Sequence, residues 1–178
     1  MLDQIRRIVT GHNRQGLSVV HFDSILPRRL GSNRRGVTEL WNTDDGSVDS
    51  FAAEDRLDRP FSLVPALRGS TFLFFTVAPD VPGANPESEM KRAAAAFAAY
   101  GANHARPNTN RNPWMHKTKT IDYIIVLSGE VTLLLDDDER ELKPFDVVIQ
   151  RGTNHAWINR GKEPALLAAV LMDAEVRC

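Results

Sequence analysis

Five short apolar segments separated by tight turns lie between residue 121 and residue 172, and they restrict the folds open to this chain. Each segment is rich in β-branched or long aliphatic residues, as strands are. They read IDYIIVLSG, EVTLLL, FDVVIQ, NHAWIN and PALLAAVLM, and the connections between them contain SG, DDDER, RGT and NRGKE. Parallel strands need crossover connections of a dozen or more residues. The short spacing therefore predicts a mainly β protein with an antiparallel sandwich or barrel.

The N-terminal part predicts fewer strands, which lie farther apart. Segments 17–22, 36–42 and 71–77 have strand composition and end at Gly, Pro, Asn or Asp. Residues 42–60 are polar and predict a long surface connection, although such a length also indicates an unrecognised element. These strands are too few for an independent domain. We therefore expect residues up to about Val77 to add strands to the C-terminal barrel, in the same subunit or in a dimer partner.

One helix is predicted at about residues 86–100. Its sequence, PESEMKRAAAAFAAY, is dense in helix formers, begins with proline and carries acidic residues in the first turn, and Gly101 follows as a stop. It can pack outside the barrel, or it can present Met90 and Phe97 as an interaction surface. The predicted organisation is a single domain in which residues 1–105 form an extension with this helix and residues 106–178 form the barrel core.

Charge and cysteine content exclude some classes of function. With 22 basic and 23 acidic residues the net charge is -1, and no basic block is present. We therefore expect neither a nucleic acid nor a membrane as partner. The single cysteine, Cys178, cannot form an intrachain disulfide, which fits a cytoplasmic protein.

Three residues in or next to the predicted strands favour a metal site. His116 precedes the first of these strands, Asp122 lies within its apolar run, and His155 follows a glycine turn. Neutral imidazoles and a carboxylate bind Fe(II), Mn, Zn or Ni and leave coordination positions open. The alternative is that the histidines are structural and that Asp122 is a turn aspartate or forms an ion pair. Its candidate partners are Lys117, Lys119 and Arg151.

The segment from His116 to Asn159 resembles the two consecutive motifs of the cupin superfamily. The first motif is matched by His116, Lys117 and Thr118, then by Asp122 and the turn residue Gly129, and the second motif by Gly152, His155 and Asn159. The sequence departs from the family pattern in three places. Thr118 replaces a second histidine, Asp122 replaces a glutamate, and Phe145 replaces a glycine.

The resemblance implies a jelly-roll β-barrel with His116, Asp122 and His155 as ligands of one divalent transition metal (Fe, Mn, Zn or Ni). Loss of the metal site in this branch is the alternative that Thr118 leaves open. Further residues that can line the site are Thr118, Gln150, Asn154 and Trp157, of which Trp157 can equally be core. No catalytic acid or base can be named. Cupins commonly pair, so the resemblance also implies a homodimer.

The resulting functional hypothesis is a metal-dependent cupin enzyme acting on a small organic acid or an aromatic metabolite. Lyase or isomerase chemistry needs the metal only as a Lewis acid. An Fe(II)-dependent dioxygenase would also bind oxygen. A third alternative is a non-catalytic small-molecule-binding protein, in which Trp157 and its neighbours should fill the barrel.

Overall fold

The computed structural model describes residues 4–27, 30–31, 36–52 and 54–175, and Cys178 lies outside them. The strands are β1 (Gln4–His12), β2 (Ser18–Pro27), β3 (Leu30–Gly31), β4 (Gly36–Thr43), β5 (Ser70–Val77), β6 (Thr120–Ser128), β7 (Val131–Leu135), β8 (Glu139–Leu142), β9 (Val147–Arg151), β10 (His155–Ile158) and β11 (Ala165–Asp173). The helices are α1 (Pro86–Ala99) and the short 3₁₀ helix η1 (Asn103–Ala105).

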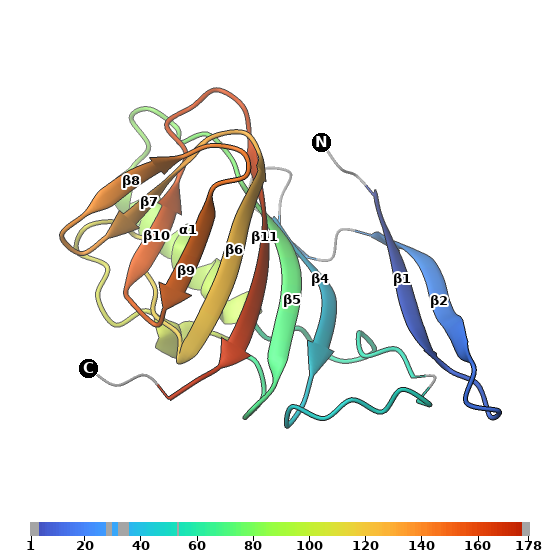
Figure 1. The fold of residues 1–178 in the computed structure, drawn as a ribbon. Helices are drawn as coiled ribbons and strands as arrows, with labels where there is room; N and C mark the ends of the chain where they lie inside the picture. Colours follow the sequence, from blue (N-terminus) through green and yellow to red (C-terminus); the bar gives the residue numbers. More distant parts are fainter. Residues whose placement is uncertain (1–3, 28–29, 32–35, 53, 176–178) are drawn as a thin grey trace.

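Two antiparallel sheets face each other and enclose the core (Figure 1). Over the described residues, the larger sheet has six strands in the order β3-β4-β5-β11-β6-β9, and the smaller has three in the order β10-β7-β8. Every pairing in both sheets is antiparallel. The prediction of a mainly β, antiparallel jelly-roll barrel is confirmed. β8 was not predicted, because its sequence EREL contains one apolar residue and three charged ones.

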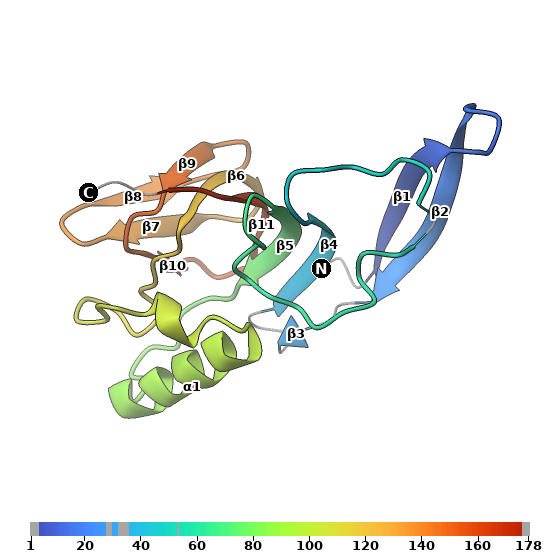
Figure 2. The ribbon, with the colours of Figure 1, turned by 90° about the horizontal axis from the view of Figure 1, so that it is seen from below.

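The chain begins with a hairpin that stands apart from both sheets (Figures 1 and 2). β1 and β2 pair only with each other among the described strands, so this pair does not extend the barrel of its own subunit. Its addition to the barrel of a dimer partner stays a prediction. Arg7 interrupts the apolar pattern of β1. Its guanidinium is buried between the rings of Phe22 and Trp41 and pairs with Asp55. The strands β4 and β5, in contrast, do extend the larger sheet.

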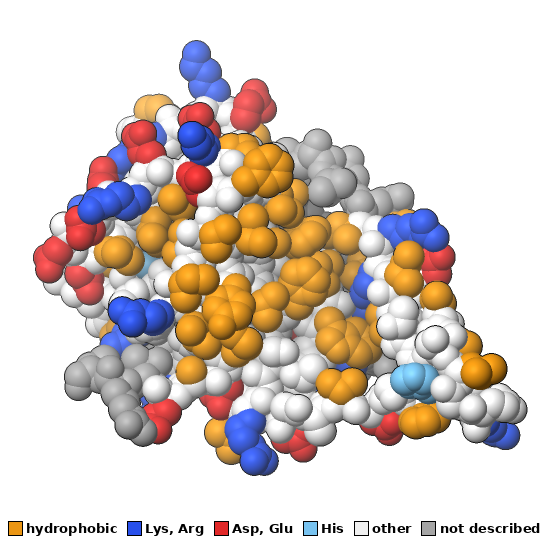
Figure 3. Space-filling model, viewed as in Figure 1, with side chains coloured by type: hydrophobic (Ala, Val, Ile, Leu, Met, Phe, Trp, Pro, Cys, Tyr) orange, Lys and Arg blue, Asp and Glu red, His pale blue; other side chains and the backbone are white. Residues whose placement is uncertain are grey.

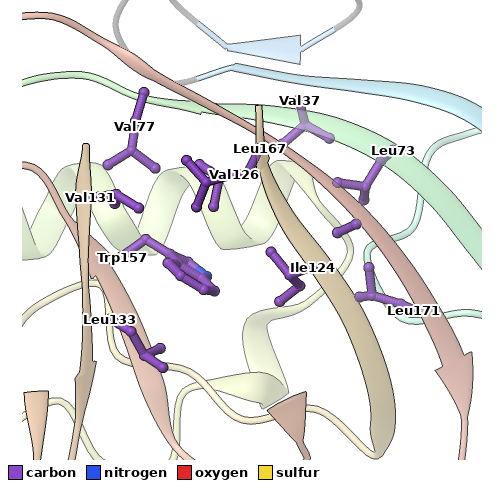
Figure 4. Packing of buried hydrophobic residues seen from close by; sticks show 12 residues of the cluster. Val37, Leu73, Val77, Ile124, Val126, Val131, Leu133, Trp157, Leu167 and Leu171 are labelled. Carbon is purple, nitrogen blue, oxygen red and sulfur yellow. The ribbon is translucent and has the colours of Figure 1, made fainter. Parts of the chain in front are cut away.

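The inner face of the larger sheet packs against the smaller sheet. Its outer face carries many apolar side chains, which Figure 3 shows gathered over the neighbouring strands of this sheet. The inner apolar side chains form the main core, in which Trp157 points between the two sheets (Figure 4). The most deeply buried members of this core are Leu73, Val77, Val126, Ala165 and Leu167.

Two positions link the ends of the core strands. Gly129 joins β6 to β7 with a positive φ of 73°, and a Cβ there would lie 2.7 Å from the carbonyl oxygen of Pro164. Asn159 is fully buried, and its amide nitrogen donates to the carbonyl oxygens of Val77 and Glu163, each at 2.8 Å. The amide oxygen of Asn159 accepts from the N–H of Gly161 at 2.8 Å. These contacts hold the ends of β5, β10 and β11 together.

The helix α1 is not part of the barrel. It lies next to the smaller sheet, on the side of the larger sheet that faces the core (Figure 2). Asn85 caps it, because its side-chain oxygen accepts from the N–H groups of Glu87 (2.9 Å) and Ser88 (3.2 Å). The helix buries Ala93 and Phe97 toward the protein. The division into an extension up to residue 105 and a core after it stays a prediction.

Candidate functional site

Two histidines from different segments meet inside the fold. The backbone N–H of His116 donates to the carbonyl oxygen of His155 at 2.8 Å, and the N–H of His155 donates back at 2.9 Å. This isolated bridge lies just before β6 and at the start of β10. It brings the two imidazole rings together, with their centroids 4.2 Å apart.

The hydrogen bonds of these imidazoles fix which nitrogen is free. Nδ1 of His116 lies 3.0 Å from the carbonyl oxygen of Trp114, and Nδ1 of His155 lies 2.9 Å from that of Thr153. A carbonyl oxygen only accepts, so each Nδ1 carries the proton and each Nε2 keeps its lone pair. Burial lowers the pKa of His116 to about 4. Burial, and then the neighbouring His116, also lower the pKa of His155 well below its usual value. Both rings are therefore neutral near pH 7.

Asp122 is the third ionisable group of this region. It is 4% exposed, on the inward face of β6, and its Oδ1 has no hydrogen-bond partner among the described groups. Burial raises the pKa of Asp122 to about 6, against an opposing hydrogen bond from the Thr120 side chain. A close cation would lower this pKa. The geometry therefore gives no support to the interpretation in which Asp122 forms a structural ion pair.

A cavity of about 110 Å³ joins these groups inside the barrel. Its lining includes His116, Asp122 and His155, and its other walls are mainly aromatic and aliphatic. These walls include Val37, Leu63, Leu73, Phe75, Phe97, Tyr100, Trp114, Ile124 and Trp157. Trp157 belongs to the core and also lines the cavity, so both interpretations of this residue hold. Trp157 does not fill the barrel, because the cavity of about 110 Å³ remains beside it. The non-catalytic alternative predicted a barrel filled by Trp157 and its neighbours.

The helix α1 and the loop after it close one side of this cavity. The ring of Phe97 lies 4.8 Å from that of His116 and 6.4 Å from that of Trp114, measured between centroids. Arg106 lies over Phe97 at 5.7 Å and donates to the carbonyl oxygen of Pro113 at 2.7 Å. Because Phe97 is only 4% exposed, the interpretation in which it forms an external interaction surface is wrong.

Three of the residues expected near the site are not among the described lining residues of the cavity. The hydroxyl of Thr118 lies 2.6 Å from that of Thr120. Gln150 lies directly across from Asp122 in the sheet, but its amide donates to Thr153. Asn154 donates to the carbonyl oxygen of Asn108 at 3.1 Å and to Asp136 at 2.8 Å. Each side chain is thus used in a local contact.

The donor set fits a metal ion in part. The two free Nε2 atoms are suitable ligands for a divalent transition metal. The Nδ1 atom of each ring donates to a backbone carbonyl oxygen, and such a hydrogen bond orients a histidine that binds a metal. Asp122, whose Oδ1 has no hydrogen-bond partner, lines the same cavity. In the described parts of the chain, however, no three His, Cys, Asp or Glu side chains are close enough to share one metal. The pair His116 and His155 therefore fits a metal, and a shared site with Asp122 is not assembled.

Comparison with protein families identifies the part of the chain that contains these residues. The family model for the cupin domain matches residues 104–171, which include both histidines and Asp122. Residues 104–171 form a cupin domain. The bridge between His116 and His155 lies within this cupin domain, whereas α1 and the strands β1 to β5 precede it.

The chain has relatives among fungal proteins. "Phomopsin biosynthesis cluster protein D" of Diaporthe leptostromiformis is 60% identical over 47 residues, which are 26% of this chain and 25% of the relative. "Oryzines biosynthesis cluster protein J" of Aspergillus oryzae is 45% identical over 51 residues, 28% of each chain. "Cupin-domain-containing oxidoreductase fogC" of Aspergillus ruber is 36% identical over 63 residues, 33% of this chain and 31% of the relative. The chain thus spans only a quarter to a third of these relatives.

The cavity also contains residues that the strand pattern did not identify. Phe97, Tyr100 and Trp114 come from the helix and the loop before the cupin motifs. The only signal for Phe97 was its place on the apolar stripe of α1. In the described residues, none of the helices has the length and apolar content that crossing a bilayer requires.

Proposed function

We propose that this protein is a cupin oxidoreductase that acts on a small, uncharged aromatic metabolite bound in the cavity between His116, His155 and Trp157. The observation that carries the proposal is the pair of free Nε2 atoms at the wall of an aromatic cavity. The names of relatives such as fogC, a cupin-domain-containing oxidoreductase, support redox chemistry over lyase or isomerase chemistry.

The lining of the cavity supports an uncharged aromatic substrate over a small organic acid. It contains no lysine or arginine among the described residues, so a substrate carboxylate would have no cation to pair with. An ionised Asp122 would repel such a carboxylate. Aromatic walls from Phe75, Phe97 and Trp157 can instead pack on a ring. An apolar cavity of roughly 150 Å³ holds one benzene ring, so this cavity of about 110 Å³ would have to widen to admit one, and the volume limits the substrate to a single ring.

Different residues of the chain would bind the metal, orient the substrate and exclude water. His116 and His155 would hold a divalent transition metal through Nε2, and such a metal, when bound, supplies open coordination positions for substrate or oxygen. The carbonyl oxygens of Trp114 and Thr153 would keep both imidazoles in the ligating tautomer. Phe97 and Trp157 would orient the ring, and α1 would exclude water.

Metal content is the measurement that tests this proposal. The untagged protein should contain close to one iron, manganese, nickel or zinc per chain by plasma mass spectrometry. His116→Ala and His155→Ala should each lose the metal, whereas His104→Ala, at an exposed histidine of η1, should keep it. Asp122→Ala tests the carboxylate as a third ligand. Protein that contains no metal, and takes up none when it is added, would refute the oxidoreductase proposal.

Isomerase or lyase chemistry is the second candidate, and Asp122 favours it. A buried carboxyl with a pKa of about 6 can exchange a proton with substrate near neutral pH. Asp122→Asn keeps the size of the side chain and removes this proton exchange. If turnover of a phenol or aromatic aldehyde consumes no oxygen and is lost in Asp122→Asn while metal content is unchanged, the second candidate is favoured.

A further inference from the structure

A groove of about 420 Å³ lies where the N-terminal hairpin approaches the larger sheet. Ile5 of β1 lines it on the hairpin side, and Phe74 of β5 and Leu166 of β11 line it on the sheet side. Ser128 and Glu163 add polar groups to its lining. The groove is larger than the cavity of about 110 Å³ beside the histidine pair, and the two spaces meet at the same part of the sheet.

The groove and the cavity share part of their walls. Gly36, at the start of β4, and Phe75 and Thr76 of β5 line both spaces. The cavity extends from these residues to His116 and His155. The three shared residues therefore belong to the wall between the groove and the histidine pair.

A side-chain hydrogen bond joins the two strands at this wall. The register of β4 and β5 runs from Val37, which lies opposite Phe75, to Thr43. Gly36 lies beyond this ladder. Its N–H donates to the hydroxyl oxygen of Thr76 at 3.0 Å, and the same hydroxyl lies 3.5 Å from the carbonyl oxygen of Gly36. Because Gly36 has no side chain to fill the space, the Thr76 hydroxyl helps to hold this end of β4 against β5.

Phe75 differs from the other inward-facing residues of β5. Side chains alternate between the two faces of a strand, so the inward positions are Thr71, Leu73, Phe75 and Val77. Thr71, Leu73 and Val77 are each 2% exposed, whereas Phe75 is only partly buried. Its ring lies 5.9 Å from that of Trp157, measured between centroids. The Phe75 ring thus lies between accessible space and the part of the cavity beside Trp157.

The α1 side of the cavity is packed more firmly. Phe97 is 4% exposed, and the ring of Tyr100 lies 6.1 Å from that of Phe97 and 6.0 Å from that of Phe61. The N–H of Leu63 donates to the carbonyl oxygen of Tyr100 at 2.9 Å, which ties the chain before β5 to the end of α1. An opening on this side would break these contacts together. A rotation of the Phe75 ring, in contrast, breaks no backbone hydrogen bond.

We infer that small molecules enter and leave the cavity through this groove, past the ring of Phe75, and that the Thr76 hydroxyl sets how readily the strands part there. The inference rests on the proposed function only in that the cavity binds a small aromatic molecule. A ring that rotates away from Trp157 joins the groove to the cavity, and its return excludes water. Such a gate acts on the rates of binding and release more than on affinity, because it changes the path and not the bound state.

Blocking the groove from outside tests the path without altering the cavity. The probe is fluorobenzene, an uncharged single ring, and its binding and release are followed by fluorine NMR exchange spectroscopy. In a Cys178→Ser background, Leu166→Cys places a thiol in the groove wall, directly across from Thr76. A bulky maleimide attached there should lower the association and dissociation rate constants by at least about 10-fold each. Val170→Cys is the matched control, because it lies on the same face of β11 but outside the described lining of both spaces, and its label should change the constants by less than about two-fold.

Substitutions at the gate test its two residues. Phe75→Ala should raise both rate constants by at least about 10-fold. Thr76→Val keeps a similar shape and removes the hydroxyl, so it should raise them by at least about 3-fold. Phe72→Ala is the control on the outer face of the same strand, and it should stay within about two-fold of the wild type. Urea unfolding of each variant verifies that it is folded under the conditions of the NMR measurement.

The outcomes separate this inference from the proposed function. A label on the Leu166→Cys variant that leaves both constants unchanged, or a larger increase in Leu63→Ala than in Phe75→Ala, would overturn the path while the metal site stands. Protein that contains its metal but binds no fluorobenzene would overturn the path together with the aromatic substrate. Protein without metal that exchanges fluorobenzene through the groove would support the path and refute the oxidoreductase proposal.

Discussion

Replacing Gly129 by alanine tests how closely the turn between β6 and β7 approaches the start of β11. A Cβ at this position would lie 2.7 Å from the carbonyl oxygen of Pro164 and 2.8 Å from Cα of Ala165. Both atoms belong to the backbone, so the strands must separate to admit a methyl group. Gly83 is a matched control, because it has nearly the same φ (72° against 73°) but no atom within 4 Å of an added Cβ.

The magnitudes follow from these two contributions. A left-handed backbone conformation costs an alanine about 1–2 kcal/mol, and both variants bear this cost. The clash applies only at Gly129, and overpacking of this kind adds about 1–3 kcal/mol. We therefore expect the free energy of unfolding to fall by about 2–5 kcal/mol in Gly129→Ala and by about 1–2 kcal/mol in Gly83→Ala.

Urea unfolding followed by tryptophan fluorescence measures both values, with Trp157 as a reporter in the core. With a slope of about 2 kcal/mol per molar urea, Gly129→Ala should lower the midpoint by about 1–2.5 M. Protein concentration is held constant, since association shifts apparent stability. Equal losses in Gly129→Ala and Gly83→Ala would show that the backbone contact contributes nothing, and the reasoning would be refuted.

Three further predictions concern the core, pH and the cavity. Asn159→Leu should lower the free energy of unfolding by about 2–3 kcal/mol in urea titrations, because the fully buried side chain loses three hydrogen bonds, one buried and two part-buried; a loss below about 1 kcal/mol would contradict this. Metal-free protein should lose stability as the pH falls from 6.5 to about 4. The pKa values of His116 and His155 are lowered in the folded protein, so over this range the two histidines bind protons in the unfolded chain before they do so in the folded one. Asp122, whose pKa is raised from 3.8 to about 6, acts in the opposite sense, so the variant with both histidines changed to asparagine should become more stable over this range, and urea midpoints that still fall would refute the assignment. Phe97→Ala should lower stability by about 3–5 kcal/mol and enlarge the cavity, measured by urea unfolding and by increased binding of a small aromatic probe; unchanged binding would argue against α1 as the cavity wall.

Strand composition and turn chemistry were sufficient to predict the barrel. The apolar runs of β6, β7, β9, β10 and β11 and the turn at Gly129 were all visible in the sequence. The hairpin strand β1 was missed because Arg7 occupies an inward position. Its charge is compensated by Asp55, far along the chain, which no local pattern can indicate.

The site was predictable only in part. His116 and His155 were identified from their motif spacing, and the structure brings them into contact. The wall formed by Phe97 and Trp114 depends on how α1 folds back on the barrel, and that long-range contact leaves no periodic signal. The sequence also could not show that the Thr118 hydroxyl is used by Thr120 rather than by the cavity.

The backbone bridge between His116 and His155 has a consequence for how the cavity can vary. Because two reciprocal hydrogen bonds set the position of His116, the preceding loop does not have to set it. The side chains of the cavity wall, such as Phe97 and Trp114, can therefore differ while the backbone bridge keeps the imidazole pair in place. The shape of the cavity can thus diversify independently of the two histidines.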